Sequence, residues 1–162
     1  MIDRQELCAA QHFGYWMAKP SWLSAVVASY NAGALPNSVV DEDDAPPCRV
    51  DETGVAYIGV QGQLTKGRSS FGGTSSVATR QALRAAEGDA DVKGIMLDVD
   101  SPGGTVDGQL ALGDEVYRVR SAGNKPIHVH ADGGMHSAAL WTGSQAGFVS
   151  ASPMTEIGSI GT

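Results

Sequence analysis

Two short segments carry the residues whose types and spacing are suited to acyl-transfer chemistry. The first, residues 94–104, starts as a short apolar run and ends in a turn that contains Gly103 and Gly104. The run is bounded by breakers, which predicts a buried strand. Because glycine has no Cβ, another group can approach its backbone N–H closely. A helical pattern follows from Thr105 or Val106, so peptide donors and a helix N-terminus are expected to face one point, which suits an oxyanion. An ordinary strand-to-helix turn is the alternative interpretation.

The second segment is residues 132–137, which ends in Ser137 and leads into a helix of small residues from Ala138. The order of elements predicts an α/β fold with a mainly parallel sheet, in which ligands bind beyond the carboxyl ends of the strands. Adjacent parallel strands would bring the two turns together. A serine at the head of a helix, opposite peptide N–H donors, is the arrangement that a nucleophile needs.

The body of the chain repeats strand and helix. Apolar runs predict strands at 54–60, 94–99, 127–131 and 148–151, and helical periodicity predicts helices at about 74–87, 105–121 and 138–141. Residues 152–162 have the composition of turns. We expect this body to span residues 50–162.

Residues 1–49 form the predicted N-terminal region. Residues 1–18 have no clean period and are interpreted as a flexible arm, and a helix is expected from Pro20 that packs on the body or on a neighbouring subunit. Residues 35–47 form an acidic, proline-containing linker. Its acidic run at 41–44 could bind a cation, but a solvated run is the favoured interpretation, and no metal site is predicted.

The composition excludes several classes of protein. The 162 residues carry a formal net charge of −7, which argues against a nucleic-acid-binding surface. Two cysteines are too few for a disulfide framework, and they do not have the Cys-x-x-Cys spacing of a zinc site. We see no apolar run long enough to span a membrane and no signal peptide, so a cytoplasmic location is expected.

Three segments together resemble one family. Residues 98–106 with Asp-Ser-Pro-Gly-Gly, residues 134–141 around Ser137, and residues 151–161 with Gly-Ser-Ile-Gly resemble the signal peptide peptidase A-type serine peptidases in order and separation. The resemblance covers about residues 54–162. The N-terminal part, with Ala-Lys-Pro at 18–20, resembles the phage branch of head maturation proteases, which process scaffold and capsid proteins inside a prohead.

The resemblance implies a Clp protease/crotonase-like fold and a polypeptide substrate, without a cofactor. It implies Ser137 as the nucleophile and an oxyanion hole from the N–H of Gly104, with Ala138 as the second donor and Gly103 in the same turn. Members of this fold usually form rings or stacked oligomers, so a homo-oligomer is expected, in the bacterial host cytoplasm or the phage prohead.

The general base is the element that this sequence lacks. The family uses a serine–lysine dyad, and its lysine follows the Gly-Ser-Ile-Gly segment, whereas no Lys, His or Arg occurs between Ala138 and Thr162. We therefore expect a C-terminally incomplete domain that has little activity alone, with exposed apolar surface and an unpaired sheet edge. The residues weighed as substitutes each have a structural interpretation that is favoured: Lys66, Lys125, His136, and the pair His128 and His130, which share one face of a strand.

Two further functions stay open. The first is a non-catalytic, oligomeric capsid-assembly protein that keeps the fold without turnover. The second, weaker one is a crotonase-like acyl-CoA enzyme, which would also stabilise an oxyanion with backbone N–H groups. The well-formed serine turn favours the peptidase over the acyl-CoA enzyme, and the absent base keeps the assembly protein in consideration.

Overall fold

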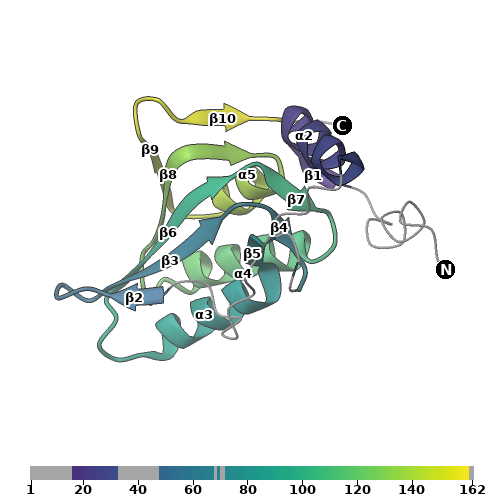
Figure 1. Ribbon diagram of the computed structural model, residues 1–162. Coiled ribbons are helices and arrows are strands. Elements are labelled where there is room, and N and C mark those ends of the chain that lie inside the picture. The colour runs from purple at the N-terminus through teal and green to yellow at the C-terminus, as the bar shows by residue number, and fades with distance from the viewer. Residues whose placement is uncertain (1–15, 33–47, 68, 70–71, 161–162) are drawn as a thin grey trace.

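The computed structural model describes residues 16–32, 48–67, 69 and 72–160 (Figure 1). The linker at 35–47 and its acidic run lie outside the described residues. Six strands form the larger sheet: β3 (Val55–Gln61), β6 (Gly94–Ser101) and β8 (Ile127–His136) at its centre, with β2 (Cys48–Val50), β9 (Phe148–Ala151) and β10 (Glu156–Gly158) around them. Only β2 pairs antiparallel; the other pairings are parallel. The predicted α/β fold with a mainly parallel sheet is confirmed.

One face of this sheet is covered by helices. In β6, Ile95, Leu97 and Val99 are buried, whereas the alternate residues Asp98 and Asp100 are exposed. Because successive side chains of a strand point to opposite faces, this pattern means that only one face packs on the core. The covering helices are α3 (Ser76–Gly88), α4 (Gln109–Ala122) and the short α5 (Ala138–Gly143).

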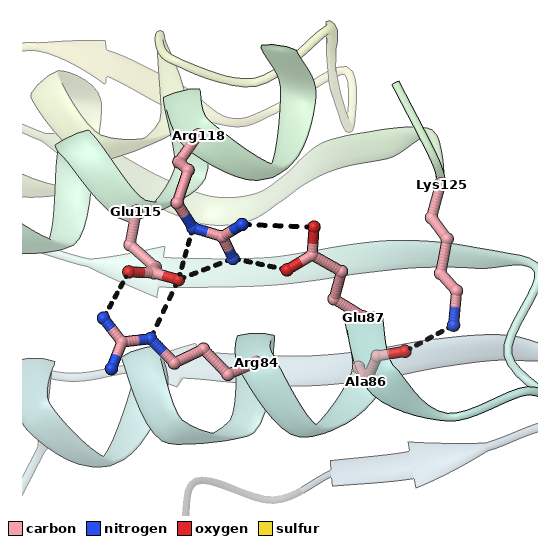
Figure 2. Close-up of polar contacts among 6 residues, drawn as sticks. All are labelled: Arg84, Ala86, Glu87, Glu115, Arg118 and Lys125. Atoms are coloured by element: carbon pink, nitrogen blue, oxygen red, sulfur yellow. Dashed lines mark hydrogen bonds and ion pairs between the residues drawn. The ribbon is translucent and has the colours of Figure 1, made fainter. Parts of the chain in front are cut away.

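A network of charged side chains joins α3 to α4 (Figure 2). The Glu115 carboxylate, which is 5% exposed, accepts hydrogen bonds from Arg84 Nη2 at 2.8 Å and from Arg118 Nη2 at 2.8 Å. Arg118 also pairs with Glu87. The hydrogen bond from Arg84, followed by those from Arg118, holds the pKa of Glu115 below its usual range despite burial. The two helices are therefore held together by a nearly buried carboxylate with two cationic partners.

A second, smaller sheet lies beside the first and was not expected. It contains β1 (Trp16–Ala18), β7 (Gly103–Thr105), β4 (Leu64–Thr65) and β5 (Thr74–Ser75), in that order. The interpretation of residues 1–18 as a flexible arm is therefore wrong for residues 16–18, which pair with β7. The helix predicted from Pro20 is confirmed as α2 (Pro20–Asn31), which follows β1 directly.

Three predicted boundaries differ from the structure. The helix expected from 105 begins only at Gln109, because 103–105 pair as a strand and Gly108 adopts φ 85° at the helix start. The strand expected to end at 131 runs to His136, with an irregularity in its pairing to β6. The turn-like segment 152–162 contains the strand β10, which pairs with β8. Each difference arises from pairing with a distant strand, which outweighs the local glycine signal.

No helix among the described residues is long and apolar enough to cross a membrane.

Candidate active site

The two chemistry-bearing turns leave the sheet at neighbouring strands. β6 and β8 are parallel partners, and near their carboxyl ends Ser101 lies opposite Met135. The diglycine strand β7 begins two residues after Ser101, and Ser137 follows Met135 by two residues. The helix α5 that Ser137 begins also contacts β7. The expectation that adjacent parallel strands bring the two turns together is therefore confirmed.

Ser137 has an unusual backbone conformation. Its φ of 51° and ψ of −110° make it one of two non-glycine residues with positive φ in the part of the chain that the structure describes. Its N–H donates to the Gly158 carbonyl at 3.0 Å and its carbonyl accepts from the Trp141 N–H at 2.8 Å, so both of its peptide groups are held. Strained backbone conformations persist only where neighbouring contacts hold them, and they cluster at functional sites. The side chain is half-buried and its hydroxyl makes no capping hydrogen bond to α5.

The diglycine turn is fixed from within the fold. Ser101, which is 1% exposed, donates from its hydroxyl to the Gly62 carbonyl at 2.6 Å and accepts from the Gly103 N–H at 3.2 Å. A Cβ on Gly104 would lie 1.7 Å from the Leu64 carbonyl oxygen, so only glycine fits between β7 and β4. Because Ser101 already engages the Gly103 N–H, Gly104 is the residue of the pair that we consider as an oxyanion donor, and its position in β7 is opposite Met17 of β1. The roles of Gly104 and Ala138 as oxyanion donors stay predictions.

Three ionisable side chains, those of Lys19, His136 and Glu156, line a pocket beside the diglycine turn. His136 is largely buried, and its Nε2 lies 3.7 Å from Glu156 Oε2. Glu156 also forms an ion pair with Lys19, whose hydrogen bond and charge lower the pKa of that carboxyl. Burial, followed by the charge of Lys19, lowers the pKa of His136. The lowered pKa favours the neutral form of the imidazole.

An open pocket of about 400 Å³ lies at this place. Its lining residues are Lys19, Ser21, Asp100, Ser101, Pro102, Gly133, Gly134, His136 and Glu156. The pocket adjoins a second hollow of about 730 Å³ that shares Lys19, His136 and Glu156 with it. The Asp100 carboxylate packs against Gly133, where a Cβ would lie 2.5 Å from Asp100 Oδ1. The lining of the pocket therefore contains two carboxylates, of Asp100 and Glu156, and the ammonium group of Lys19.

Lys19 is the residue at this site that the sequence did not identify. It is 137 residues from Glu156 and it belongs to no motif of the body, although it stands in the Ala-Lys-Pro segment noted for the phage branch. Its ammonium is paired with the Glu156 carboxylate. In this arrangement Lys19 is a charge partner rather than an acceptor for the Ser137 proton.

The residues weighed as alternative bases have other contacts. Lys66 Nζ lies 3.3 Å from Asp107 Oδ2 on the surface, and Lys125 Nζ donates to the Ala86 carbonyl at 2.8 Å, near the C-terminus of α3 (Figure 2). His136 lies over Gly134, where its ring atoms would come within 3.1 Å of a Cβ.

His128 and His130 share one face of β8, as predicted, and both contact the Ser150 hydroxyl at 2.9 Å. His130 precedes Ser137 by seven residues, and its ring nitrogens contact the hydroxyls of Ser150 and Ser152. Among the described residues no group of three or more His, Cys, Asp or Glu is arranged to hold a metal ion.

Curated proteins with similar sequences include two proteases and one phage protein. The chain is 36% identical over 107 residues to Protease 4 of Salmonella typhi and 30% identical over 107 residues to Protease 4 of Haemophilus influenzae; each match covers 66% of this chain and 17% of the relative. It is 33% identical over 112 residues to a head-tail preconnector protein of Enterobacteria phage P21, covering 67% of this chain and 22% of that protein. The chain thus spans about a fifth of the length of these curated relatives. No protein-family model matches the chain.

Solved structures define the fold class. An enoyl-CoA hydratase/isomerase family member superimposes with a TM-score of 0.56 at 14% identity, covering 69% of this chain and 49% of that one. A protein described as an enoyl-CoA hydratase/isomerase from Mycobacterium abscessus gives 0.50 at 19% identity, over 70% and 50% of the two chains. The fold is therefore of the crotonase-like class that the sequence resemblance implied. At these identities the comparison concerns the fold alone.

Proposed function

We propose that this chain is part of a serine endopeptidase in which Ser137 attacks a peptide carbonyl. The observation that carries the proposal is the backbone of Ser137, which is held at positive φ at the head of α5, beside the diglycine strand. A strained serine between a strand and a helix exposes its oxygen at the end of the sheet, where neighbouring peptide N–H groups can hold a developing oxyanion. The similarity to Protease 4 sequences supports the same chemistry.

The steps follow from the roles assigned to these residues. A base removes the Ser137 proton, Oγ bonds to the substrate carbonyl carbon, and the oxyanion is held by the N–H groups of Gly104 and Ala138. As the tetrahedral intermediate collapses, the protonated base gives its proton to the leaving amine, the peptide bond breaks and an acyl-serine is left. The same base then takes a proton from the water that attacks the acyl-serine, and Ser137 leaves as the protonated hydroxyl with release of the acid. The base is proposed to be a lysine that lies beyond Thr162 in the longer protein, as the family resemblance implies, and burial would keep that lysine neutral.

The similarity to a phage head-tail preconnector protein supports a substrate among phage structural proteins and an assembled, oligomeric state. The same observation favours the second candidate, a capsid-assembly protein without turnover. The two differ in whether Ser137 is reactive. The crotonase-like neighbours support the fold only, so the acyl-CoA enzyme stays the weaker alternative.

Labelling with a fluorophosphonate tests the proposal, because this probe reacts with activated serines. We expect Ser137 to be labelled in the complete gene product, and the Ser137→Ala variant to lose at least about 100-fold in labelling rate. Ser144→Ala is the matched control, since Ser144 is an exposed serine at the other end of α5 and should leave labelling unchanged. The 162-residue chain alone should hydrolyse peptides little or not at all. Full labelling of the Ser137→Ala variant would exclude the peptidase.

A further inference from the structure

The outer edge of β7 is occupied by a segment of the same chain. The three residues of β1 pair antiparallel with the three of β7, with Ala18 opposite Gly103. The ladder continues past β1, because the Lys19 N–H donates to the Pro102 carbonyl at 2.7 Å. On its other side β7 pairs with β4 through Gly104 and Leu64. The N-terminal segment 16–19 therefore covers the one edge of the diglycine strand that the body leaves open.

The register determines which peptide groups are covered. Along an antiparallel ladder, hydrogen-bonded and non-hydrogen-bonded pairs alternate. Since Lys19 and Pro102 form a hydrogen-bonded pair, the pair two positions along, Met17 and Gly104, is of the same type. The peptide groups of Gly104 thus face the backbone of Met17. Gly104 is the residue whose N–H is assigned to the oxyanion, so the segment lies where a reacting carbonyl would lie.

The side chain of Lys19 is held in the acidic pocket. Its Nζ pairs with Glu156, and Asp100 and His136 line the same pocket of about 400 Å³. The Lys19 and Glu156 side chains are 37% and 64% exposed, so the ion pair is of the weak, solvent-screened kind. Three backbone pairs and one screened ion pair make a contact that a competing strand can displace.

We propose that the β7 edge and the acidic pocket form a docking groove for an extended polypeptide with a basic side chain, and that residues 16–19 are its tethered occupant. An extended peptide that adds to a sheet edge gains affinity from main-chain hydrogen bonds and specificity from side-chain pockets. Glu156 and Asp100 supply the negative charge that selects lysine or arginine at the position of Lys19. The inference rests on the proposed function in one respect: a substrate that reaches Ser137 along β7 must first displace residues 16–19.

Charge reversal in the full chain tests the docking. In the Lys19→Glu variant two carboxylates face each other, so amide hydrogen exchange of Gly104, whose peptide groups face Met17, should accelerate at least about threefold. The Glu156→Lys variant should behave similarly, and the double variant with both substitutions should regain the slow exchange. Lys66→Glu is the matched control, because Lys66 is another surface lysine in an ion pair, with Asp107. Unchanged exchange in Lys19→Glu, or equal acceleration in Lys66→Glu, would overturn the proposal.

A synthetic peptide tests whether the groove accepts a separate polypeptide. Added to the Lys19→Glu chain, the peptide with the sequence of residues 16–21 should restore protection of the Gly104 amide, and its counterpart with glutamate in place of the lysine should not. Failure of the first peptide, or equal effects of the two, would refute the groove or its preference for a basic residue.

Fluorophosphonate labelling of the same variants in the complete gene product separates the two proposals. Ser137 should react several-fold faster in Lys19→Glu than in the unsubstituted protein, and the double variant should return to the slower rate. If Ser137 is unreactive in every variant while the exchange results hold, the groove stands and the peptidase fails. If Ser137 reacts equally in all and exchange is unchanged, the peptidase stands and the tethered occupant fails.

Discussion

At the scale of single residues, the candidate site depends on a position that has no room for a side chain, Gly104, and on a serine with a strained backbone, Ser137. Gly104 lies so close to the Leu64 backbone that any side chain would collide with it. Ser137 is the opposite case: it has a side chain, yet it holds a backbone conformation that L-residues rarely adopt. Both features, the close contact at Gly104 and the strained backbone at Ser137, arise because peptide N–H groups and a serine hydroxyl are placed at the same end of one sheet.

Gly104→Ala is expected to destabilise the protein strongly. A Cβ at this position would lie 1.7 Å from the Leu64 carbonyl oxygen and 2.5 Å from its carbonyl carbon, so β4 or β7 must move. We expect a loss of at least about 2 kcal/mol in the free energy of unfolding, at the upper end of overpacking effects. Denaturant unfolding measures this loss. Gly67→Ala, where a Cβ meets nothing within 4 Å, should change stability by less than about 0.5 kcal/mol. Equal effects of the two substitutions would contradict the close contact.

At the scale of elements, α3 and α4 are joined by the ion pairs of Glu115 with Arg84 and Arg118, which are only partly shielded from water. Glu115 is nearly buried, but the side chains of Arg84 and Arg118 are 57% and 47% exposed. A buried carboxylate is costly unless its hydrogen bonds are satisfied, and here both of its oxygens accept from guanidinium groups (Figure 2). These helices cover the sheet beneath the site, so their packing supports the position of the β6 and β8 ends.

Glu115→Gln should therefore lower the free energy of unfolding by about 1–2 kcal/mol at pH 7, because the neutral amide loses the charge-assisted bonds. The effect should depend on pH. A carboxyl whose pKa is lowered in the folded state contributes stability above its unfolded pKa, and this contribution is lost as the pH falls through the folded pKa. The difference between the unsubstituted protein and the variant should thus shrink below about pH 4–5.

Thermal unfolding as a function of pH measures this dependence. Asp114→Asn, the exposed neighbour on the same helix, serves as the matched control and should show a much smaller effect at every pH. A pH-independent difference for Glu115→Gln would mean that its carboxylate contributes through packing rather than through charge.

At the scale of the whole molecule, apolar side chains gather where the larger sheet ends. β9 and β10 each pair with β8 and with no other strand in the described part of the chain. Phe148 and Val149 on β9 are 64% and 39% exposed, and Met154 and Ile157 nearby are 91% and 48% exposed. An open strand edge with exposed apolar side chains favours association with another chain.

We expect the 162-residue chain to self-associate through this edge. Phe148→Lys should raise the dissociation constant of the assembly at least about tenfold, because a charge on an edge strand opposes pairing. Sedimentation velocity over a range of concentrations measures it. Val77→Lys is the matched control, since Val77 is an exposed apolar residue on α3, a helix that packs on α4 and β3. Equal self-association of the two variants would place the contact elsewhere.

Local patterns in the sequence were sufficient to predict the central strands and the helices that pack on them. The apolar runs at 94–99 and 148–151 and the helix from Pro20 are where they were expected. Alternation and helical periodicity arise from backbone geometry within a few residues, so they can be read without knowing the fold. The parallel strands β6 and β8, which pair in the larger sheet, then bring the Ser137 turn beside the diglycine turn.

The tertiary structure alone decided what surrounds that pair of turns. Nothing in the sequence around Lys19 indicates a partner 137 residues away, and nothing in 16–18 indicates that these residues pair with β7. Such contacts depend on which sheet edge and which pocket the folded body leaves open, and these exist only after the strands have assembled. Local patterns were enough to predict the central parallel strands and the serine turn at the head of α5. The pairing of residues 16–18 with the glycine strand was not predictable, because that strand edge forms only when the chain folds.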